Sequence, residues 1–174
     1  MRKRLFLIQL FLLILIFSIA WGENNKKKSY SYVGALDIRI HPDEGNLNPP
    51  AELLLTDPKG RRVGNDPKRN KTFKEITNSS YEHEGIADAE TGDPGPETAI
   101  IYIRNPIIGE YNLQVIGIKS SKYILEIRGY DCEMNHSSAE FTNVMINKNT
   151  EHHYLIRYSN KKESKIDVTL IRKK

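Results

Sequence analysis

The feature that most constrains this chain is a repeated alternation of apolar and polar residues with a period of two. In residues 36–40 every second side chain is apolar and the intervening ones are charged, which is typical of a strand with one buried and one solvated face. Similar short segments recur between clusters of Gly, Pro, Asn and Asp. The expected strands are 36–40, 51–56, 73–76, 99–103, 111–115, 123–127, 142–146, 154–158 and 166–170.

This pattern predicts one all-β domain over residues 32–174, an antiparallel β-sandwich of about eight or nine strands. An open barrel is the alternative. No segment after Gly22 has the period of a helix. Residues 77–97 are rich in turn-forming residues and predict a long loop, a kind of segment that often carries function.

The alternation also predicts which side chains form the core. One inner face is expected to carry Tyr111, Leu113, Val115, Tyr123, Leu125 and Ile127. The last three strands are expected to point Thr142, Val144, Ile146, Tyr154, Ile156, Tyr158, Ile166, Val168 and Leu170 inward.

Residues 1–22 have the organisation of a signal peptide. Three basic residues precede an apolar run over 5–19, and Ala20 and Gly22 offer two cleavage positions. The run is shorter than the roughly 20 apolar residues of a spanning helix, and an uncleaved anchor is the alternative. We therefore expect a secreted, periplasmic or cell-surface protein that keeps no membrane span after cleavage, with residues 23–31 as a disordered leader.

Charge content bears on the class of partner, and cysteine content bears on the source of stability. The chain has 26 Lys and Arg against 22 Asp and Glu, and removing the three basic residues of the signal peptide leaves 23 against 22. A nearly neutral mature domain gives no reason to expect a nucleic-acid partner. The one cysteine, Cys132, has no partner for an intramolecular disulfide, so the core must supply the stability.

Residues 50–131 carry a series of turn and strand motifs. They are the segment 51–64, Gly95-Pro96-Glu97, Asn105-Pro106, Gly109-Glu110-Tyr111 with its continuation to 117, and the segment 123–127. In this order they resemble the immunoglobulin-like and pre-peptidase C-terminal β-sandwich modules of secreted bacterial proteins. The resemblance implies a non-catalytic accessory role.

One motif within that series has a physical meaning of its own. Gly109 permits a sharp turn, and Tyr111, two residues later, can bury its ring while its hydroxyl reaches a nearby carbonyl oxygen. We therefore expect a hydrogen bond from Tyr111 to the backbone just before it.

The expected loop contains the one local charge anomaly. Between Glu82 and Glu97 the chain has six carboxylates and no Lys or Arg. Oxygen ligands in a Gly-containing loop suit Ca²⁺, so Asp88, Glu90 and Asp93 are candidate calcium ligands, to which Asp57 or Asp66 could add. The spacing does not match an EF-hand, and a solvated acidic loop is the alternative.

No catalytic motif is recognisable, and the five histidines are scattered along the chain. We expect a secreted, non-catalytic β-sandwich module with a binding or structural role and an unidentified protein or glycan partner. A carbohydrate-binding module is one alternative, with Tyr30, Tyr32, Tyr81 and Tyr130 as candidate stacking residues. A small secreted hydrolase with dispersed catalytic residues is the other, because a long polar loop can carry such residues.

Overall fold

The computed structural model describes residues 34–87 and 89–173, and its regular elements there are all strands. They are β1 (Ala35–Pro42), β2 (Ala51–Thr56), β3 (Arg62–Asp66), β4 (Lys71–Lys74), β5 (Ser79–Ala87), β6 (Pro94–Arg104), β7 (Gly109–Gly117), β8 (Ser121–Tyr130), β9 (His136–Ile146), β10 (Glu151–Tyr158) and β11 (Asp167–Lys173). The expected signal peptide (1–22) and leader (23–31) lie outside the described residues. The described part of the chain contains no helix with the length and hydropathy that a membrane span requires.

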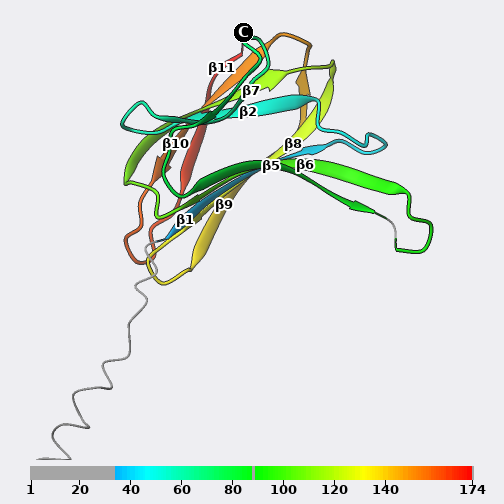
Figure 1. Cartoon of the computed structure of the whole chain (residues 1–174). Coiled ribbons are helices and arrows are strands. Elements are labelled where there is room, and N and C mark those ends of the chain that lie inside the picture. The colour runs from blue at the N-terminus through cyan, green and yellow to red at the C-terminus, as the bar shows by residue number, and fades with distance from the viewer. Residues whose placement is uncertain (1–33, 88, 174) are drawn as a thin grey trace, which may run out of the picture. The chain divides into compact units, whose positions relative to one another are not determined.

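The strands form two antiparallel sheets that face each other as a β-sandwich (Figure 1). The five-stranded sheet has the order β5-β6-β1-β8-β9, and the six-stranded sheet has the order β11-β10-β7-β2-β3-β4. All-β architecture is thus confirmed, with eleven strands in the described residues instead of the eight or nine expected. The two that were not expected, β3 and β5, are rich in Gly, Asn, Ser and charged residues and lack an apolar alternation.

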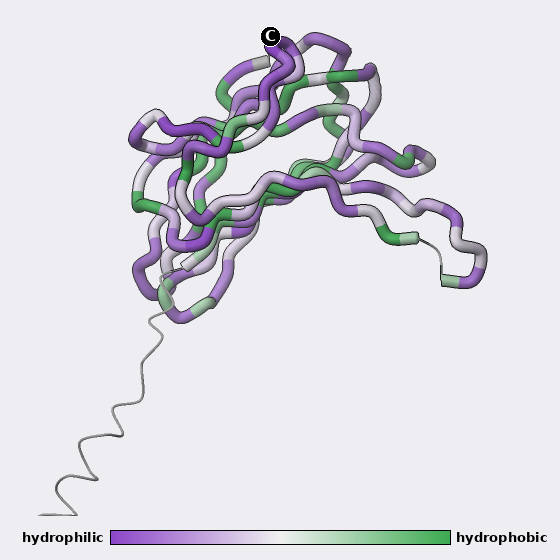
Figure 2. The backbone as a smooth tube through the Cα atoms, viewed as in Figure 1, coloured by the Kyte–Doolittle hydropathy of each residue, from purple (hydrophilic) through white to green (hydrophobic). Residues whose placement is uncertain are grey.

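The core lies between the two sheets, where the hydrophobic segments in Figure 2 meet. All six predicted core residues on β7 and β8 are at most 1% exposed. They do not share one inner face, however, because β7 belongs to the six-stranded sheet and β8 to the five-stranded one. The predicted alternation along each strand was correct, and the β7 set and the β8 set face each other across the core.

The prediction of a long loop at residues 77–97 was wrong. β5 and the first half of β6 form an antiparallel hairpin there, with Glu84 opposite Thr98 and Gly85 opposite Glu97. Its outer part extends beyond the sandwich (Figure 1), so both faces are solvated and the apolar side of a strand pattern is missing. Backbone pairing with β6, which the sequence pattern does not display, creates β5.

The predicted inward set on β9 was correct for Val144 and Ile146 and wrong for Thr142. Tyr123 pairs with Val144 whereas Leu125 pairs with Phe141, so β9 has one extra residue in this interval. Asn143 within this bulge has a positive φ of 56°. The bulge shifts the side-chain alternation by one residue, which turns Thr142 outward and puts Phe141 against the core instead.

The turn before β7 has the predicted geometry. The Tyr111 hydroxyl donates a hydrogen bond to the carbonyl oxygen of Ile107 at 2.8 Å, and the Tyr111 side chain is buried. Gly109 has φ 143°, and a Cβ there would lie 2.9 Å from the Pro58 ring. The arrangement matches the tyrosine corner of Greek-key sandwiches.

Candidate binding surface

The outer face of the five-stranded sheet carries mainly polar side chains in rows that cross all five strands, with buried Ile100 as an apolar exception. The strand registers place one row as Ser80, Tyr102, Asp37, Arg128 and Ser138. They place the next row as Glu82, Ile100, Arg39, Glu126 and Glu140. We call this face the five-stranded outer face.

Two acidic and two basic residues in the middle of these rows form a square of alternating charge. On β1, Arg39 Nη2 lies 3.0 Å from Asp37 Oδ2, and on β8, Arg128 Nε lies 2.5 Å from Glu126 Oε1. Across the strands, Asp37 is opposite Arg128 and Arg39 is opposite Glu126. Each charge therefore has an opposite charge both along its own strand and on the neighbouring one.

One of the two acidic corners of the square is buried. Asp37 is only 4% exposed although it points away from the core, and Arg39 Nε lies 3.1 Å from each of its carboxylate oxygens. Hydrogen bonding to Asp37 raises the pKa of Arg39, against a lowering by partial burial. Hydrogen bonding to Glu126 likewise raises the pKa of Arg128. Both guanidinium groups are cations, and each lies against a carboxylate of its own strand.

Aromatic side chains lie next to the square, Tyr102 beside it on β6 and Tyr130 beyond Arg128 on β8. Tyr102, opposite Asp37, is 37% exposed. Tyr130 on β8 packs against His136 of β9, with ring centroids 5.6 Å apart and planes inclined at 38°. The face therefore offers flat aromatic surface next to fixed donors and acceptors, a combination that suits sugar rings and polar protein surfaces alike.

The opposite end of this face carries a histidine in a polar contact. His41 Nδ1 lies 2.9 Å from the Thr98 hydroxyl oxygen. Burial lowers the pKa of His41, with the nearby Arg39 and Arg128 acting in the same direction and Glu126 opposing. The lowered pKa favours the neutral form of the His41 ring.

The three predicted calcium ligands fall on the connection between β5 and β6. Asp88 lies outside the described residues, while Glu90 and Asp93 are exposed. Among residues 34–87 and 89–173, no three His, Cys, Asp or Glu side chains are grouped as a metal site requires. Calcium binding here stays a prediction.

Asp57 and Asp66, the other suggested ligands, organise turns instead. Asp57 Oδ1 accepts a hydrogen bond from the Lys59 amide at 2.9 Å, and Asp66 Oδ1 accepts one from the Lys68 amide at 3.1 Å. Asp131 does the same with the amide of Glu133 at 2.8 Å. All three residues are buried. Each carboxylate accepts a hydrogen bond from the amide two residues later and thereby stabilises a tight turn as an Asx motif.

A second polar cluster joins the base of the β5–β6 hairpin to the six-stranded sheet. Tyr81 donates a hydrogen bond to Glu52 of β2, and burial followed by this bond raises the pKa of Tyr81. His83 Nε2 lies 3.1 Å from the Tyr81 hydroxyl oxygen and 3.4 Å from Glu52 Oε2, and its Nδ1 lies 3.7 Å from Glu97 Oε2. Both ring nitrogens face protein oxygens, and the contacts of this group link the two sheets.

The core contains a third polar group, which is structural. The Tyr123 hydroxyl lies 2.7 Å from His152 Nδ1 and 2.8 Å from the Tyr154 hydroxyl, and all three residues are buried. Burial, then the charge and hydrogen-bond interactions with Tyr154, raise the pKa of Tyr123. A buried hydroxyl requires a partner of this kind, so the group satisfies polar atoms within the sandwich.

Of the four candidate stacking residues, the structure places one on the five-stranded outer face. That residue is Tyr130; Tyr81 is bound to Glu52, and Tyr30 and Tyr32 lie outside the described residues. The sequence analysis missed Tyr102 and the charge square. A signal was present, because both β1 and β8 contain an acid-x-Arg triplet in an alternating strand.

No protein-family model, curated protein or solved structure matches this chain.

Proposed function

We propose that the chain is an exported, non-catalytic β-sandwich module that binds a partner through the five-stranded outer face. The signal-peptide pattern of residues 1–22 supports export. The resemblance to immunoglobulin-like and pre-peptidase C-terminal modules supports an accessory role. The binding role depends chiefly on one observation, the ordered square of Asp37, Arg39, Glu126 and Arg128 beside exposed Tyr102.

The physical reason is preorganisation. The Arg128–Glu126 pair, whose side chains are 36% and 21% exposed, contributes only about 0–1 kcal/mol to stability, so folding alone gives little reason for it. Buried Asp37, in contrast, requires a charged partner such as Arg39. Side chains already fixed in place lose little rotamer freedom when a ligand binds. Fixed guanidinium and carboxylate groups also give directional specificity to a polar partner.

A carbohydrate ligand is the second candidate, favoured by the exposed ring of Tyr102 and the Tyr130–His136 pair. A hydrolase has less support: His83 does approach Glu97, but its ring nitrogens are both directed at protein oxygens. We therefore place a polar protein surface first and a glycan second.

The test immobilises the mature chain and measures binding to extracellular proteins of the producing cell and to a glycan array. The Tyr102→Ala variant is compared with Asn112→Ala, a control on β7 of the other sheet, where Asn112 is exposed. Binding that Asn112→Ala retains and Tyr102→Ala loses supports the proposal. Equal binding by both variants would place the ligand elsewhere.

A further inference from the structure

Two consecutive hairpins of this chain carry opposite charge. Residues 59–74, which include β3 and β4, contain seven Lys and Arg and a single acidic residue, Asp66. Residues 75–103, which include β5 and most of β6, contain seven Asp and Glu and no Lys or Arg. We call the first the basic hairpin and the second the acidic hairpin.

The acidic hairpin extends from the sandwich without a core behind it. From Glu82 to Ala87 every side chain of β5 is exposed, and Ile86 is 81% exposed. A two-stranded hairpin alone is marginally stable in water. β5 is also an edge strand of its sheet, so its outer backbone groups face away from β6.

The charges of the two hairpins are only partly balanced within one molecule, because four of the seven basic residues of the basic hairpin, Arg61, Arg62, Lys68 and Arg69, form ion pairs. In the described part of the chain neither Glu82 nor Asp93 forms an ion pair, and the same is true of Lys71 and Lys74. Arg69 has a side chain 69% exposed, at 3.5 Å from Asp66. Unbalanced charge therefore remains on both surfaces.

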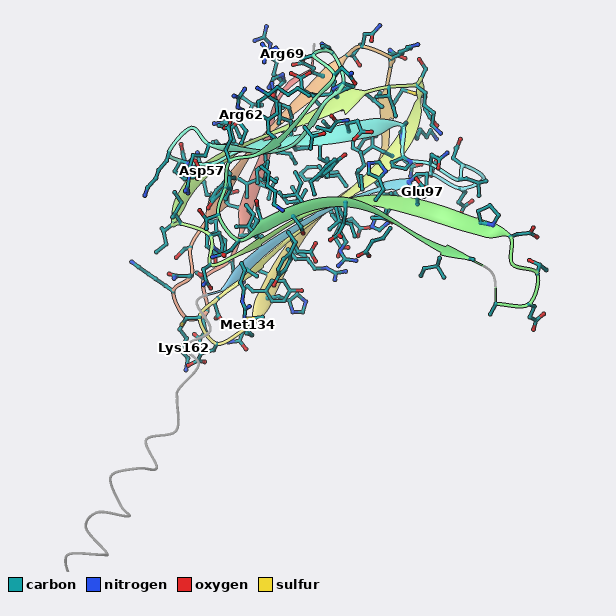
Figure 3. The ribbon with its side chains drawn as sticks, in the orientation of Figure 1. Asp57, Arg62, Arg69, Glu97, Met134 and Lys162 are labelled. Atoms are coloured by element: carbon teal, nitrogen blue, oxygen red, sulfur yellow. The ribbon has the colours of Figure 1, made fainter. Side chains whose placement is uncertain are left out.

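Within one molecule the two hairpins meet where they join, with Arg62 Nη2 3.2 Å from Glu75 Oε1. Arg62 and Arg69 of the basic hairpin lie on one side of the sandwich, while Glu97 and the outer part of the acidic hairpin lie toward the other side (Figure 3). The unpaired charges of the two hairpins remain available for attraction between molecules.

We propose that copies of this chain associate head to tail, with the acidic hairpin of one copy lying on the basic hairpin of the next. The aliphatic stems of Lys71 and Lys74 offer apolar cover to Ile86, while their ammonium groups meet Glu82 and Asp93. Each copy has one surface of each kind, so the contact is heterologous and extends into short open chains or closes into a ring. Of the residues that define the five-stranded outer face, Glu82 alone takes part in this contact.

A symmetric pairing of two acidic hairpins would be repulsive. Antiparallel pairing of two β5 edges would bring Glu82 and Glu84 of one copy near the same residues of the other, and like charges at such positions oppose pairing. Charge complementarity therefore favours the head-to-tail contact.

Sedimentation of the mature chain tests the proposal. The chain should associate with rising concentration at about 0.01 M salt, where charges act over about 30 Å, and dissociate near 1 M salt, where they act over about 3 Å. Glu82→Lys/Asp93→Lys and Lys71→Glu/Lys74→Glu should each be monomeric alone. An equimolar mixture of the two variants should associate again, because each then offers a surface complementary to the other.

The control for net charge is Lys148→Glu/Lys161→Glu, which changes two exposed lysines outside both hairpins and should associate like the parent. Unchanged melting temperatures show that the variants are folded. A parent chain that stays monomeric at low salt overturns the proposal, as does association that either hairpin variant retains. Loss in both variants without recovery in the mixture overturns it too.

Discussion

The hydroxyl of Tyr111 donates a hydrogen bond to the carbonyl oxygen of Ile107, four residues earlier, at 2.8 Å. This bond fixes the turn that leads into β7, a central strand of the six-stranded sheet. Tyr111→Phe keeps the ring and removes the donor, so it should lower the free energy of unfolding by about 0.5–1.5 kcal/mol. Urea denaturation measures the change, and a midpoint equal to that of the parent would mean that the bond does not stabilise the fold.

Leu125 tests the register of the five-stranded sheet. It is fully buried at the centre of the core, and Leu125→Ala should cost about 2–5 kcal/mol because the cavity is only partly refilled. Met145→Ala, a substitution of a 54% exposed side chain on neighbouring β9, is the control and should change the stability by less than about 0.5 kcal/mol. A larger loss for Met145→Ala than for Leu125→Ala would indicate that the inward and outward faces are exchanged.

Asp131 should make the stability depend on pH in the acidic range. Burial favours the protonated form, but hydrogen bonds from the Glu163 amide and the Asn135 side chain, and from backbone amides of its own turn, outweigh it and lower the pKa of Asp131. Because the folded value lies below the unfolded one, the stabilisation is complete above the unfolded value of about 3.9 and is lost as the pH falls through the folded value.

Asp131→Asn removes this titration. Its stability deficit relative to the parent should therefore be largest at neutral pH and shrink below about pH 4. Guanidinium denaturation at several pH values measures it, with exposed Glu44→Gln as the control. A deficit that is the same at pH 7 and pH 3 would contradict the assigned role of the carboxylate.

Calcium binding at the β5–β6 connection remains a prediction that thermal unfolding can test. The sequence places Asp88, Glu90 and Asp93 within six residues, and a divalent cation would offset their negative charge with a dissociation constant on the order of 10⁻⁴ to 10⁻³ M. Millimolar Ca²⁺ should therefore raise the melting temperature. The rise should disappear in Asp88→Asn/Asp93→Asn, and an equal rise with Mg²⁺ would reduce the effect to screening.

Some of the structure could be predicted because the signal is local. The Tyr111 bond follows from Gly109 and a two-residue spacing, and the core positions of β7 and β8 follow from alternation within single strands. β5 was missed because its pairing with β6, not an apolar face, holds it in place. Thr142 was misplaced because a bulge with Asn143 at positive φ shifts the alternation.

The candidate surface depends on information that is not local. The square of charges requires that β1 lie between β6 and β8, and that Asp37 be opposite Arg128. The acid-x-Arg triplets of β1 and β8 indicate one charged face on each strand, but the pattern within a strand does not determine which strands are neighbours. The register between distant strands therefore had to come from the structure.

Hydroxyl-radical footprinting of the mature chain, with and without its captured protein or glycan partner, tests the central claim most directly. Tyr102, 37% exposed on the five-stranded outer face, reports on the proposed site, and Ile171, 56% exposed on β11 of the other sheet, is the internal control. We expect the partner to protect Tyr102 from oxidation and to leave Ile171 unchanged. Protection of Ile171 with Tyr102 still reactive would contradict the assignment of the binding surface.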